Sequence, residues 1–96
     1  MKGTEKQIAY AQFFVDKFDV EMNGLIEMCP EQFKTQWVNL KEKVDLFFEE
    51  AYAGDVIELL KPIRETGKKY YVRFVSRVRI SADPLCNRIK KEFYDG

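Results

Sequence analysis

The sequence contains no histidine, so the commonest general base and the commonest metal ligand of proteins are both missing. Ser–His and Cys–His nucleophile arrangements are therefore excluded. The two cysteines, Cys29 and Cys86, form no CxxC pair, and we expect reduced thiols rather than a disulfide or a zinc site. A glycine-rich phosphate loop is absent, and the carboxylates lack the compact spacing of a calcium loop. We expect no enzymatic activity, no metal and no cofactor.

Long apolar runs are also missing. No stretch approaches the roughly 18 apolar residues that cross a bilayer, and residues 1–7 lack the apolar core of a signal peptide. We therefore expect a cytoplasmic protein without a membrane partner. The 96 residues, of which 46% are hydrophobic and 15% aromatic, suffice for one small domain over residues 1–96.

Arginine is absent from the first 60 residues, which carry six lysines and twelve aspartates or glutamates. Residues 61–96 carry ten lysines or arginines and four acidic residues. The chain is thus neutral overall, but its first part has a net charge of −6 and its second part +6. Such an asymmetry indicates a binding surface or pairing between the two parts, and charge alone does not separate them.

A first helix is predicted to begin at Glu5, because Thr4 and Gln7 have the spacing of a capping box. We expect Asn23–Gly24 to end it, since both residues tolerate a left-handed backbone. The core-facing residues recur at helical spacing and are Ile8, Ala11, Val15, Phe18 and Met22. A second apolar line, which we expect to pack under a later helix, consists of Ala9, Phe13 and Val20.

The clearest pattern is that of a second helix, from Pro30 and Glu31 to a glycine cap at Gly54. Its apolar residues are Phe33, Trp37, Leu40, Val44, Phe47, Phe48 and Ala51. The opposite side carries what we call the acidic stripe, Glu42, Asp45, Glu49 and Glu50. This stripe is either a solvated helix face or a surface that meets a basic groove on another macromolecule.

A short third helix is expected to start at Asp55 and to end at Pro62 or Thr66–Gly67, with a hinge or turn over residues 62–69. Residues 70–80 fit either a strand or a helix. No other segment resembles a strand, and a lone strand leaves backbone groups unpaired unless a second chain completes the sheet. We therefore predict a helix there.

A last helix follows, with Asp83 as its N-cap and Pro84 at its first position. The predicted fold is thus all-α, a small bundle of four to five helices. The alternative is an α+β fold in which residues 70–80 form a strand paired in a dimer.

A cluster of cations, which we call the basic strip, follows the turn: Lys68, Lys69, Arg73, Arg77 and Arg79. Aromatic residues are interleaved with these cations, as in surfaces where lysines contact phosphates and tyrosines stack on bases. The same face could instead pair with the acidic stripe, and the sequence leaves this question open.

The opening run Lys2-Gly3-Thr4-Glu5-Lys6-Gln7-Ile8-Ala9-Tyr10-Ala11 resembles the start of small proteins encoded by bacterial phages and mobile elements. These begin with Gly-Ser/Thr-Glu-Lys-Gln-Ile, followed by an aromatic residue and Ala. The resemblance carries over no functional residue, because the tryptophan-rich segment found further along in many of them is not matched here. It implies an accessory protein of a phage or mobile element, a group whose small members often block host factors, as anti-CRISPR proteins do.

Our leading hypothesis is therefore a protein-interaction module, monomeric or homodimeric, that inhibits a nucleic-acid-handling host protein such as a CRISPR effector in the bacterial cytoplasm. Either the acidic stripe or the basic strip would contact this partner. The alternative is a small DNA- or RNA-binding regulator that uses residues 68–79.

Overall fold

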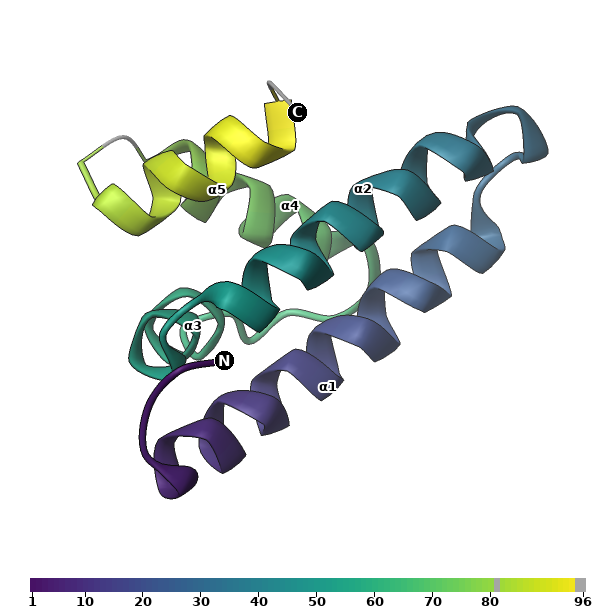
Figure 1. Ribbon diagram of the computed structural model, residues 1–96. Helices are drawn as coiled ribbons and strands as arrows, with labels where there is room; N and C mark the ends of the chain where they lie inside the picture. Colours follow the sequence, from purple (N-terminus) through teal and green to yellow (C-terminus); the bar gives the residue numbers. More distant parts are fainter. Residues whose placement is uncertain (81, 95–96) are drawn as a thin grey trace.

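The computed structural model describes residues 1–80 and 82–94. These residues form five α-helices, α1 (Glu5–Met28), α2 (Glu31–Glu50), α3 (Ala53–Leu60), α4 (Gly67–Arg79) and α5 (Pro84–Tyr94) (Figure 1). The described residues contain no strand, only an isolated bridge between Lys2 and Tyr52. The predicted all-α bundle is confirmed, and the strand alternative for residues 70–80 is wrong.

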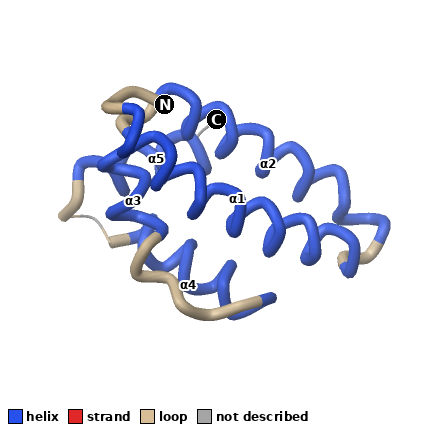
Figure 2. Tube along the Cα trace, turned by 90° about the horizontal axis from the view of Figure 1, so that it is seen from below, coloured by secondary structure: helices blue, strands red, loops and turns tan. Residues whose placement is uncertain are grey.

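The helices α1 and α2 run antiparallel as a long hairpin (Figure 1), and α4 lies on one face of this hairpin (Figure 2). The helix α3 packs on α1, while α5 packs on α2 and α4. Phe18 of α1 lies at the centre of the core, with ring centroids 5.3 Å from Phe48 of α2 and 5.1 Å from Phe74 of α4. Aromatic contacts at this spacing add to the apolar burial that holds the three helices together.

The start of α1 is as predicted, because the Gln7 N–H donates to Thr4 Oγ1 and the Thr4 N–H donates to Gln7 Oε1. The predicted end at Asn23–Gly24 is wrong, since α1 continues to Met28. Leu25 packs against the core in this last part, and its burial outweighs the low helix propensity of the two preceding residues. Gly24 keeps an ordinary negative φ.

The helix α2 ends at Glu50 rather than at the predicted Gly54, which lies inside α3. Residues from the start of the chain cause this break. The Lys2 N–H donates to the Ala51 carbonyl at 2.9 Å, and the Ala53 N–H donates to the Lys2 carbonyl at 2.7 Å. In a continuous helix, the Ala51 carbonyl and the Ala53 N–H would have partners within the helix. Their pairing with Lys2 therefore separates α2 from α3. Asp55 consequently lies in the first turn of α3 instead of capping it.

Two helix ends are capped by side chains from other helices. Thr66 makes no side-chain cap for α4; instead, the Gly67 N–H donates to Glu21 Oε2 of α1 at 2.5 Å. Arg77 of α4 donates from Nε and Nη2 to the carbonyls of Leu59 and Glu58, at 2.8 Å and 2.9 Å. A carboxylate at a helix N-terminus and a cation at a C-terminus both match the helix dipole.

The last two helices, α4 and α5, complete the core. The helix α4 buries Tyr70, Phe74 and Val78, which belong to one helical arc. The N-cap role of Asp83 is confirmed, since its Oδ1 accepts the Leu85 N–H at 2.9 Å. Both cysteines are free thiols, as predicted.

The second apolar line of α1 does not pack under a later helix. Ala9 is exposed, Phe13 is 66% exposed and Val20 is 71% exposed. The helices α3 and α4 cover the neighbouring face of α1 instead, because that face carries the residues of the central core. The prediction for this line is therefore wrong.

Candidate functional site

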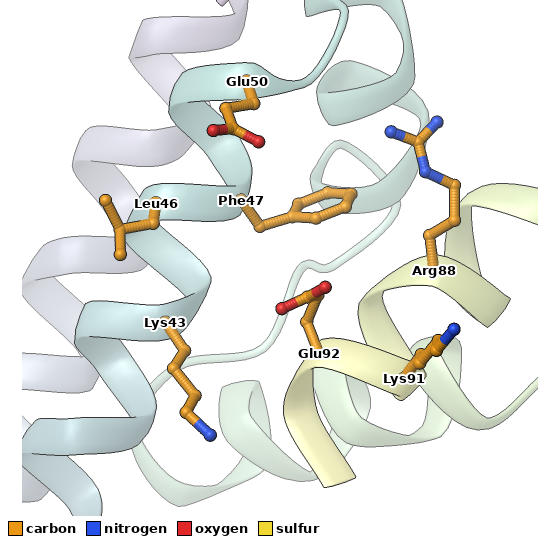
Figure 3. Close-up of a pocket in the computed structure, with 7 residues that line it drawn as sticks. All are labelled: Lys43, Leu46, Phe47, Glu50, Arg88, Lys91 and Glu92. Carbon is orange, nitrogen blue, oxygen red and sulfur yellow. The ribbon is translucent and has the colours of Figure 1, made fainter. Parts of the chain in front are cut away.

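The structure divides the acidic stripe between two sides of α2. Glu42 and Glu49 are exposed on one face of α2, which we call its outer face. Glu49 also borders a surface pocket beside α1, in which Asp45 is half-buried. Glu50 lies on the other side, in a pocket of about 360 Å³ that it shares with Arg88 and with Lys91 of α5. Figure 3 shows Phe47 reaching from α2 toward α5 in this pocket. Glu42, Glu49 and Glu50 are thus all exposed, but only Glu42 and Glu49 share a face of α2.

Asp45 takes part in a charge cluster that links α1 to α2. Lys41 Nζ lies 2.7 Å from Asp45 Oδ2 and 3.1 Å from Asp19 Oδ1. Burial raises the pKa of the Asp19 carboxyl, and the contact with Lys41 offsets this only in part. Burial alone would lower the pKa of Lys41, but the two carboxylates outweigh it and raise that pKa above its usual 10.5. Asp45 therefore stabilises the α1–α2 hairpin, and Lys41 largely neutralises its charge.

The basic strip is also divided. Lys68, Lys69 and Arg73 border one surface hollow of about 410 Å³ on α4. Arg77 lies apart from them, because its guanidinium caps α3. Arg79 is exposed beyond the hollow at the end of α4.

Arg73 is held by a neighbour in the turn before α4. Its Nε donates to Glu65 Oε1 at 2.9 Å. A hydrogen bond from the backbone of Glu65 itself, together with the one from Arg73, lowers the pKa of the Glu65 carboxyl. Arg73 of the strip and Asp45 of the stripe thus each have a partner close to them in sequence.

An apolar groove lies between the α1–α2 turn and α4, and we call it the turn groove. Its volume is about 460 Å³. Its main lining residues are Leu25, Met28, Phe33, Trp37, Tyr71 and Val72. Met28 is 73% exposed, Phe33 44% and Val72 62%. Lys68 is the one charged residue among those that line it.

The sequence did not reveal this groove, because Phe33 and Trp37 belong to the apolar pattern of α2 and no local signal places Tyr71 beside them. One signal was present: aromatic residues make up 15% of a short chain, more bulk than a small core needs. The α1–α2 turn keeps these side chains at the edge of the core, where Trp37 and Tyr71 contact each other with ring centroids 4.5 Å apart.

Within residues 1–80 and 82–94, no group of three or more cysteines, aspartates and glutamates could hold a metal ion. None of the helices in this part of the chain is long and apolar enough to cross a membrane.

Comparison of the chain with protein-family models, with curated proteins and with solved structures finds no match. The charged faces and the turn groove are therefore the basis for a functional proposal.

Proposed function

We propose that the protein is a non-enzymatic interaction module that binds a nucleic-acid-handling host protein through the outer face of α2 and competes there with nucleic acid. The observation that carries this proposal is the exposure of Glu42 and Glu49. They are seven positions apart in the sequence, so they lie on one helix face about 10 Å apart along its axis. Carboxylates arranged in this way complement a basic groove that normally holds phosphates.

The charges of α4 give less support to the alternative, a regulator that binds DNA or RNA directly. Nucleic-acid affinity comes mainly from cations that neutralise phosphates. Arg77 donates to two carbonyls of α3, and Arg73 is paired with Glu65. The resemblance of residues 2–11 to phage and mobile-element proteins also favours an inhibitor, with a CRISPR effector as one candidate target in the bacterial cytoplasm.

A charge-reversal experiment tests the proposal. The variant Glu42→Lys/Glu49→Lys is compared with Glu27→Lys/Glu58→Lys, which has the same net charge and alters exposed residues elsewhere. Each protein is used to capture partners from nuclease-treated bacterial lysate, and the captured protein is then assayed for nucleic-acid binding. We expect the α2 variant to lose the partner, the control to keep it, and the wild type to weaken the partner's hold on its nucleic acid.

Equal capture by both variants would refute docking through α2. Direct binding of the wild type to DNA or RNA, with an affinity that falls steeply with salt and depends on Arg73, would establish the alternative instead.

A further inference from the structure

The turn groove is an apolar hollow that the described residues leave open to solvent. Three large side chains at its edge, Met28, Phe33 and Val72, remain open to solvent. Its volume of about 460 Å³ falls within the range of roughly 300–1,000 Å³ that is typical of ligand-binding pockets. Exposed apolar clusters that form a concave surface mark sites where another molecule docks.

The charge beside the groove selects the occupant. Lys68 and Val72 line both the groove and the adjoining hollow. The hollow is also lined by Lys69 and by the Arg73–Glu65 ion pair, so three of its four charged lining residues are cations. Glu31, at the start of α2, is paired with Lys34 and does not line the groove. An occupant that fills the groove and reaches the hollow therefore needs apolar groups next to negative charge.

The shape of the lining favours a peptide over a nucleic acid. Bases stack on open aromatic faces, but the Trp37 and Tyr71 rings are engaged with each other, which leaves Phe33 as the exposed aromatic side chain of the lining. Leu25, Met28 and Val72 offer aliphatic or thioether surfaces suited to branched side chains. Apolar anchors of an amphipathic segment fit such a groove, as in helix-in-groove recognition.

We infer that the turn groove binds an amphipathic peptide segment of a partner protein, in which leucine-like side chains enter the groove and carboxylates contact Lys68 and Lys69. This site lies on residues other than Glu42 and Glu49, so its test is independent of the test of the function proposed for α2.

The chain carries its own reporters for this site. Trp37, the single tryptophan, lines the groove. Cys29 also lines it and is half-buried, whereas Cys86 is fully buried. An occupant should change the Trp37 fluorescence and slow the reaction of Cys29 with a thiol reagent such as 5,5′-dithiobis(2-nitrobenzoate).

The probes are three synthetic peptides of about four helical turns, without aromatic residues or cysteine. They share one leucine pattern and differ only in having Glu, Gln or Lys at the polar positions. We expect saturable binding of the Leu/Glu peptide and roughly tenfold weaker binding of the Leu/Lys peptide, an order that Lys68→Glu reverses.

A matched pair of variants locates the site. Val72→Glu alters the groove, and Val20→Glu alters an exposed valine on α1. We expect Val72→Glu to abolish binding of the Leu/Glu peptide and Val20→Glu to leave it unchanged. Circular dichroism on both variants checks that each is folded.

Several results would overturn the inference. These are the absence of saturable binding, equal affinity for the three peptides, or an equal loss in the two valine variants. A thymidine oligonucleotide that changes Trp37 fluorescence at lower concentration than the Leu/Glu peptide would assign the groove to nucleic acid. Self-association in sedimentation velocity that Val72→Glu removes would assign it to a second copy of this chain.

Discussion

Replacement of Arg77 by methionine tests whether the long-range cap on α3 stabilises the fold. The change keeps most of the aliphatic stem and removes the guanidinium that donates to Leu59 and Glu58 at 2.8 Å and 2.9 Å. A hydrogen bond from a charged group contributes about 1.5–3 kcal/mol. The Glu58 carbonyl is exposed and regains water in the variant, so most of the loss comes from the partly buried Leu59 carbonyl. With the helix dipole added, we expect a loss of about 2–3 kcal/mol.

Urea titration and thermal melting, both followed by circular dichroism, measure this loss. For a chain of this size it corresponds to a melting temperature about 10–20 °C lower. The matched control is Lys69→Met on the same helix, which removes the same charge from an exposed position and should change the stability by less than about 0.5 kcal/mol. If the two variants are equally stable, the guanidinium does not cap α3 in solution and the reasoning is refuted.

Further predictions concern the stability of two glycine variants and the pH dependence that comes from Tyr70. Gly67 has a φ of +60°, so Gly67→Ala should lower the free energy of unfolding by about 1–2 kcal/mol. Gly24 is helical with open space around it, so Gly24→Ala should raise the free energy of unfolding by about 0.5–1 kcal/mol. Urea titrations in which both changes have the same sign would contradict this. Burial, assisted by the carboxylates of Glu21 and Asp19, raises the pKa of the Tyr70 phenol above its usual 10.0. The unfolded chain therefore loses this proton first as the pH rises, so the free energy of unfolding should fall above about pH 10, by up to about 1.4 kcal/mol per pH unit. Tyr70→Phe should reduce this slope and leave the part due to Lys41, whose pKa is also raised; an unchanged slope would show that Tyr70 titrates normally.

Local signals in the sequence were sufficient for several parts of the fold. The capping box at Thr4 and the Asp83–Pro84 start of α5 depend on residues a few positions apart, so they could be predicted. The helical state of most of residues 70–80 could be predicted, because an unpaired strand would leave its backbone unsatisfied. The break after Glu50 could not be predicted, since it depends on the backbone of Lys2, which is distant from Glu50 in sequence but adjacent to Ala51 in space.

The sequence predicts which charged residues share a helix face. It does not predict which of those charges are already bound to other parts of the protein. The exposure of Glu42 and Glu49 follows from the period of α2. The capping role of Arg77 depends on where α3 ends relative to α4, which no local pattern encodes. The turn groove combines residues 25–37 with residues 68–72, and only the packing of α4 on the hairpin brings these segments together.

The caps supplied by Glu21 and Arg77 also bear on how the chain opens. The first turn of α4 keeps its N-terminal partner only while α1 is docked, and the last turn of α3 keeps its partners only while α4 is in place. Local fraying of either helix end therefore requires motion of a second helix, which brings its free energy closer to that of global unfolding. Helices α1, α3 and α4 consequently form one cooperative unit, in which amide hydrogens of the short α3 are protected by contacts made outside it.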